Sequence, residues 1–79
     1  MSTITVDDYL TDGTKRAKVD RLVAAAGLDL DLVFELIDLG GDCYRFGMYE
    51  RDADGKIAST RLPDGDIEIV RRWVERWLP

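Results

Sequence analysis

The sequence predicts a small single domain of the α+β class, with two N-terminal helices, an antiparallel sheet and a C-terminal amphipathic helix. Three observations predict this architecture. Apolar residues recur at helical spacing over 14–26 and again over 67–78, which indicates two amphipathic helices. Residues 43–62 alternate apolar and polar side chains around a turn sequence, as a β-hairpin does. The whole chain, residues 1–79, has the length of one domain.

The first helix is expected over residues 14–26, with Thr14 as its cap. Gly27 suits the left-handed residue that commonly ends a helix. Further upstream, Thr5 and Asp8 have the spacing of a capping box, and residues 3–6 are also a candidate edge strand. The apolar stripe of the helix consists of Val19, Leu22, Val23 and Ala26.

Residues 28–39 fit two structures. As a strand, Leu28, Leu30, Leu32, Phe34 and Leu36 alternate onto one face. As a helix over 31–39, the acidic residues fall on one side and the apolar residues on the other. Leucine outnumbers the β-branched residues and two glycines follow, so the helix is favoured. Together with the first helix, and with a glycine at the turn, it forms a helix-turn-helix-like unit.

The hairpin at 43–62 is expected to turn at 52–55, in an Asp-Ala-Asp-Gly sequence. One strand face carries Tyr44, Phe46 and Met48, and the other carries Cys43, Arg45, Gly47 and Tyr49. Two strands alone are marginal in water. We therefore expect a third strand, from residues 3–6 or 32–38, or a helix that covers one face of the hairpin.

The last helix is expected over 67–78, capped by Asp66. Its apolar stripe places two indole rings on one face and predicts that they lie in the core or at a dimer interface. The stripe consists of Val70, Trp73, Val74 and Trp77.

The chain is acidic, with 16 Asp and Glu against 11 Lys and Arg and a net charge of -5. Free nucleic acid and anionic membranes are therefore disfavoured as partners, and basic proteins are favoured. The single cysteine, Cys43, excludes an intramolecular disulfide. No stretch has the pattern of a signal peptide or a membrane span, so a cytoplasmic location is expected.

The sequence offers little for catalysis. It contains no histidine, and so it lacks both an imidazole base and the commonest metal ligand. It has no glycine-rich phosphate loop. The Asp52–Gly55 sequence lacks the spacing of a calcium-binding EF-hand. We therefore predict a protein that is not an enzyme and that uses no cofactor or metal.

The favoured function is a protein-interaction module that inhibits or modulates a basic, nucleic-acid-handling protein. Asp29, Asp31, Glu35 and Asp38 are the predicted contact residues, because a stretch of 22–44 without any basic residue contains all four. Arg45 and Tyr49 are the predicted secondary contacts, since both residue types are enriched at interaction hot spots. In size and charge the chain is similar to phage-encoded inhibitors such as anti-CRISPR and DNA-mimic proteins, although no motif identifies a family.

Two other functions fit the sequence. A helix-turn-helix DNA-binding regulator would use the basic residues of the first helix on phosphates, and would dimerise through the C-terminal helix. Those basic residues are Lys15, Arg16, Lys18 and Arg21. A structural or assembly subunit would associate through Trp73 and Trp77.

Overall fold

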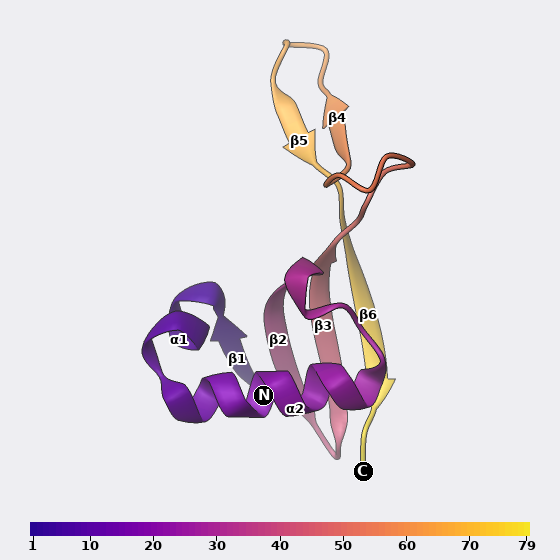
Figure 1. Ribbon diagram of the computed structural model, residues 1–79. Helices are drawn as coiled ribbons and strands as arrows, with labels where there is room; N and C mark the ends of the chain where they lie inside the picture. The colour runs from indigo at the N-terminus through magenta and orange to yellow at the C-terminus, as the bar shows by residue number, and fades with distance from the viewer.

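The computed structural model describes every residue from Met1 to Pro79, and strands dominate it (Figure 1). The N-terminal half contains β1 (Ser2–Thr5), α1 (Val6–Thr11), α2 (Gly13–Ala26), a short 3-10 turn η1 (Leu30–Leu32) and β2 (Val33–Gly40). The C-terminal half contains β3 (Cys43–Tyr49), β4 (Ser59–Arg61), β5 (Ile67–Ile69) and β6 (Arg71–Trp77).

Four of the strands form one antiparallel sheet in the order β1-β2-β3-β6. β4 and β5 form a separate hairpin, and we refer to residues 50–70, which contain it, as the arm. The arm projects away from the sheet in Figure 1. The radius of gyration is 14.0 Å, against about 12 Å for a compact chain of this length. The molecule is therefore elongated, with extents of 41 × 24 × 22 Å.

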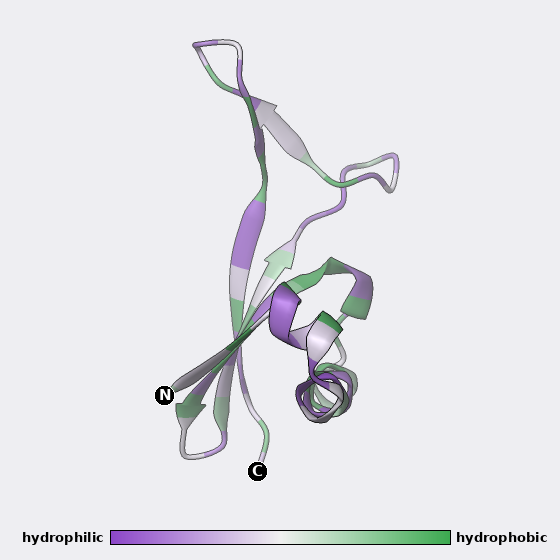
Figure 2. Ribbon diagram, turned by 90° about the vertical axis from the view of Figure 1, so that its left-hand side faces the viewer, coloured by the Kyte–Doolittle hydropathy of each residue, from purple (hydrophilic) through white to green (hydrophobic).

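The core lies between α2 and one face of the four-stranded sheet. Both helices lie on the same side of the sheet in Figure 2. Leu36 of β2 is directly opposite Phe46 of β3, and their side chains are only 2% and 0% exposed. Ile4, Met48 and three residues of α2 complete this cluster. The other face of the sheet has no covering layer.

The predicted helix over 14–26 is confirmed as α2. Its N-cap is Asp12 and not Thr14, because the Asp12 carboxylate accepts hydrogen bonds from the backbone N–H groups of Thr14 and Lys15. Gly27 ends the helix with a left-handed φ of 70°, as predicted. The capping box at Thr5 and Asp8 is also present, and it begins α1.

The predicted helix over 31–39 is wrong, and with it the helix-turn-helix-like unit. This segment is η1 followed by β2, which hydrogen-bonds to β1 on one side and to β3 on the other. Because β2 lies between β1 and β3, backbone groups on both of its sides gain ladder partners, and Val33, Phe34 and Ile37 suit a strand. Strand pairing over long sequence distances therefore outweighs the helix propensity of the leucines.

The predicted turn at 52–55 is present, with Arg51 paired to Ile57 across it, but the predicted return strand along residues 43–49 and the helix over 67–78 are wrong. β3 does form, and Phe46 and Met48 share its buried face as predicted. However, its second neighbour is β6, in a regular register from Cys43 opposite Trp77 to Tyr49 opposite Arg71. Residues 59–61 pair with β5 instead. A helix over 67–78 would leave the ladder groups of β3 without partners, whereas a strand satisfies them.

These positions give a stability test of the fold. Phe46→Ala removes a fully buried ring and should lower the free energy of unfolding by about 3–5 kcal/mol. Trp77→Ala removes a larger ring that is 69% exposed, and should cost much less. Urea denaturation followed by circular dichroism measures both. A large loss for Trp77→Ala would indicate that Trp77 lies in the core, as a C-terminal helix requires.

Candidate interaction surface

The side of the sheet opposite α2 is the largest surface without a covering element, and we call it the open face. The register of the four strands defines its membership, since alternate residues point to opposite faces. Each strand contributes side chains, and Phe34 joins them at a bulge in β2. The remaining members are Thr3, Thr5, Glu35, Ile37, Cys43, Arg45, Gly47, Tyr49, Arg71, Trp73, Glu75 and Trp77.

An aromatic cluster occupies the centre of the open face. The Phe34 ring lies over Gly47, at a centroid distance of 4.8 Å from Tyr49 and 5.6 Å from Trp73. The Arg71 guanidinium lies 5.7 Å from the Phe34 centroid and 6.0 Å from that of Tyr49. These separations fall within the ranges for aromatic and cation–π attraction. The cluster therefore holds its own side chains in place before any partner binds.

Much of this apolar surface remains in contact with water. Trp73 is 51% exposed and Trp77 is 69% exposed, although both rings are large and apolar. Beside them, Arg45 donates from Nη2 and Nε to Oε1 of Glu75, at 2.6 and 3.1 Å. Contiguous exposed apolar surface with a polar rim is typical of interaction sites.

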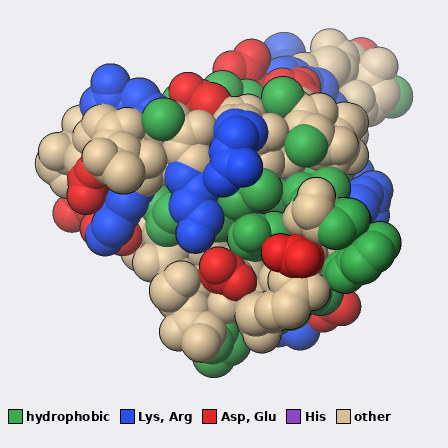
Figure 3. Space-filling view, turned by 90° about the horizontal axis from the view of Figure 1, so that it is seen from below, with side chains coloured by type: hydrophobic (Ala, Val, Ile, Leu, Met, Phe, Trp, Pro, Cys, Tyr) green, Lys and Arg blue, Asp and Glu red, His purple; other side chains and the backbone are tan.

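The four predicted acidic contact residues are not on one surface. Asp29 is the N-cap of η1 and Asp31 lies within it, Glu35 lies on the open face, and Asp38 lies on the side of α2. On the face seen in Figure 3, acidic side chains occur in separate groups between basic and hydrophobic ones. The predicted secondary contacts Arg45 and Tyr49 do share the open face with Glu35.

Ion pairs also neutralise two of the four acids. Arg51 lies 3.5 Å from the Asp29 carboxylate, and Lys18 lies 3.4 Å from that of Asp38. The Gly40 N–H donates to Asp38, and this hydrogen bond, supported by Lys18, lowers the pKa of the Asp38 carboxyl. The ion pair of Asp38 with Lys18 thus connects β2 to α2.

The sequence did not predict that Phe34, Trp73 and Trp77 share one exposed face of a sheet. Both indoles were predicted on one side of a helix, in the core or at a dimer interface, because their i, i+4 spacing also fits a helical stripe. A period-two pattern in 71–77 was the available signal. Trp73, Glu75 and Trp77 alternate with residues of the other face, so a strand places both rings on one side.

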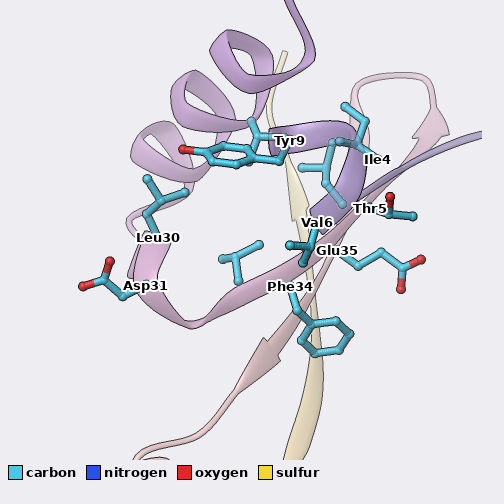
Figure 4. A pocket seen from close by; sticks show the side chains of 11 residues that line it. Ile4, Thr5, Val6, Tyr9, Leu30, Asp31, Phe34 and Glu35 are labelled. Atoms are coloured by element: carbon cyan, nitrogen blue, oxygen red, sulfur yellow. The ribbon is translucent and has the colours of Figure 1, made fainter. Parts of the chain in front are cut away.

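A groove of about 210 Å³ lies beside the open face, between α1, η1 and β2. Figure 4 shows Ile4, Val6, Tyr9 and Leu30 around it, with the carboxylates of Asp31 and Glu35 directed away from its centre. The Tyr9 hydroxyl donates to Asp20 at 2.7 Å, and this bond raises the pKa of Tyr9. The groove is smaller than the roughly 300–1,000 Å³ usual for ligand pockets.

No three His, Cys, Asp or Glu side chains lie close enough together to hold a metal ion. Neither helix has the length and apolar character needed to cross a bilayer.

Comparison with known proteins finds no matching family model, curated protein or solved structure.

The Asp38 contacts predict a pH-dependent contribution to stability. The folded-state pKa lies below the ordinary value of 3.8, so this contribution is present above pH 3.8 and is lost as the pH falls through the folded pKa. Asp38→Asn should therefore destabilise the fold at neutral pH and match the wild type at strongly acidic pH. Urea midpoints across this range measure the difference. Asp31→Asn, at a carboxylate without an ion pair, is the control, and an equal effect there would contradict the assignment.

Gly47 provides a test of the aromatic cluster. A Cβ at this position would lie 2.8 Å from the Phe34 ring and 2.9 Å from Trp73. Gly47→Ala should therefore displace both rings and destabilise the protein by about 1–3 kcal/mol. In a Phe34→Ala background the same change should cost less, because one of the clashing rings is gone. Equal costs in the two backgrounds would show that Phe34 does not lie over Gly47.

Proposed function

We propose that this protein is a non-enzymatic protein-interaction module that binds its partner through the open face. One observation carries the proposal: a four-stranded sheet covered by α2 on one side leaves an ordered aromatic cluster exposed on the other. Trp, Tyr and Arg dominate binding energy at protein interfaces. Trp73, Trp77, Tyr49 and Arg71 supply these residue types within one surface.

The charges of the open face favour a protein partner over a nucleic acid. Aromatic sheet surfaces bind single strands when basic side chains accompany the rings. Here the positive charges of Arg45 and Arg71 are matched by the negative charges of Glu35 and Glu75. Arg45 also donates hydrogen bonds to Glu75. The protein as a whole carries a charge of -5. A phosphate backbone therefore meets no net positive surface.

The same charge favours a basic partner. The arm contains six acidic residues and three basic ones, a net charge of -3 out of the total of -5. It projects next to the β3 and β6 ends of the open face. A basic protein, such as one that handles nucleic acids, would be attracted to the acidic arm. An apolar surface of that partner would then cover the aromatic rings of the open face. The unpaired, half-exposed Cys43 suits a reducing compartment such as the cytoplasm.

The DNA-binding alternative loses its geometric basis. No second helix follows α2, so no recognition helix is present. Three of the four basic side chains of α2 are also engaged within the protein. Lys15 pairs with Asp8, Lys18 pairs with Asp38, and Arg16 donates to backbone carbonyls of α1.

The proposal predicts which substitutions weaken partner binding. The partner is first captured from lysate on immobilised wild-type protein, identified by mass spectrometry, and purified for titration. Trp77→Ala should then weaken binding about tenfold or more, because exposed indoles of this kind act as hot spots. Calorimetry or surface plasmon resonance measures the affinity.

Two matched variants make the result specific. Leu10→Ala removes a side chain of similar exposure, 63%, from α1 on the other side of the sheet, and should leave affinity unchanged. An Asp29→Asn, Asp31→Asn double variant tests the acidic residues at η1. Loss of binding in that double variant with full binding by Trp77→Ala would overturn the open face as the site and place it at η1.

A further inference from the structure

β6 is an edge strand with a free side. It ends the sheet order, and β3 is its only partner. Leu78 N–H donates to Asp42, and Glu50 N–H donates to Val70. The even-numbered residues of this segment therefore direct their backbone groups toward β3. In an antiparallel ladder the odd-numbered residues, 71, 73, 75 and 77, then direct their N–H and C=O groups outward.

This edge has few of the features that block pairing with another chain. Proteins protect edge strands by shortening them, by bulges, by proline or by charged side chains, lysine above all. β6 spans seven residues, contains neither Pro nor Lys, and has an unbroken register with β3. By contrast, the opposite edge strand, β1, has only four residues. The charged residues on β6 are three arginines and Glu75, and their positions determine which strand can pair with it.

We propose that the free edge of β6 pairs antiparallel with β6 of a second copy of this chain, with Trp73 opposite Trp73 on the two-fold axis. This register places Arg71 opposite Glu75 of the other copy, twice by symmetry. Opposite-charge and aromatic cross-strand pairs both stabilise antiparallel sheets. On the other face Arg72 lies opposite Val74, so no two like charges oppose each other across 71–75.

Neighbouring two-fold registers are less favourable. A shift that centres the axis on Val74 places Arg72 opposite Arg76 twice. Centring on Arg72 places that residue opposite itself, and centring on Glu75 does the same with two carboxylates. Like charges directly opposite destabilise a sheet. The charge pattern of β6 is thus complementary to itself in the Trp73-centred register, and not in the registers centred on Arg72, Val74 or Glu75.

The side chains are free to make these pairs. Within one copy, Arg45 uses only Oε1 of Glu75, so Oε2 is left for a second guanidinium. The Arg71 guanidinium lies over Phe34 and Tyr49 without any ion pair. The dimer would join two sheets edge to edge and give eight continuous strands with a shared open face. It does not require that the open face bind another protein.

Cysteine scanning tests the register. Opposed residues in a hydrogen-bonded antiparallel pair have Cα atoms about 5.5 Å apart, within the roughly 4.4–6.8 Å that a disulfide spans. In a Cys43→Ser background, Trp73→Cys should form a covalent dimer on mild oxidation, seen on non-reducing gels. Val74→Cys and Glu75→Cys should form much less. Preferential cross-linking at 74 or 75 would overturn the Trp73-centred register.

Charge reversal tests the pairs themselves. Arg71→Glu alone opposes two carboxylates and Glu75→Arg alone opposes two guanidinium groups, so each should raise the dimer dissociation constant about tenfold or more. An equimolar mixture of the two variants restores both opposite-charge pairs and should recover the dimer as a heterodimer. Arg76→Glu is the matched control, since Arg76 faces Val70 in this register.

Sedimentation equilibrium from micromolar to low-millimolar protein measures the mass of the wild type, of each variant and of the mixture. Circular dichroism checks that each variant is folded. The wild type should approach twice the monomer mass of 9.0 kDa. A monomer throughout that range would overturn the proposal. So would a dimer that both single variants retain, because its interface would then lie elsewhere. Neither result bears on partner binding at the open face, which Trp77→Ala tests separately.

Discussion

The fold depends on the packing of α2 against the Leu36–Phe46 pair at the centre of the sheet. These two side chains, with Ile4, Met48 and three residues of α2, form the only buried cluster. A chain of about this length buries little more than about 60% of its unfolded surface. One 14-residue helix covers one face of a four-stranded sheet, and no second helical layer is left for the other. The exposed aromatic face is a consequence of this limit.

The residues outside the core are held by local and polar contacts. Asp38 joins β2 to α2 through Lys18, and Asp29 joins η1 to the arm through Arg51. The arm itself is held by its own hairpin, by a few backbone hydrogen bonds at its base, such as Val70 N–H to Ala58, and by the exposed ion pairs of Arg51 with Asp29 and of Glu50 with Arg72. A two-stranded hairpin has marginal stability in water. The molecule thus combines a part with a buried core, built around α2, with an extension that contains no buried residue.

The parts of the site that could be predicted are those fixed by residue alternation along a single strand. Arg45 and Tyr49 were correctly placed on the face of β3 opposite Phe46, because neighbouring strand residues point to opposite sides. Trp73 and Trp77 were predicted on one side of a helix, in the core or at a dimer interface, since residues four apart share a side in a helix and also in a strand. Phe34 could not have been placed, because a bulge in β2 decides its face.

By itself, the sequence determined the structures that depend on neighbouring residues: α2 with its left-handed end at Gly27, the capping box at Thr5 and Asp8, and the two faces of β3. Tertiary structure alone decided that residues 33–40 and 71–77 are strands. Their hydrogen-bonding partners lie up to 36 residues away in the sequence, as in the pair of Ser2 with Asp38. Helix and strand propensities depend on neighbouring residues, so they do not include the stabilisation gained when hydrogen bonds form on both sides of β2 and β3. That stabilisation is larger than the preference of these segments for an amphipathic helix.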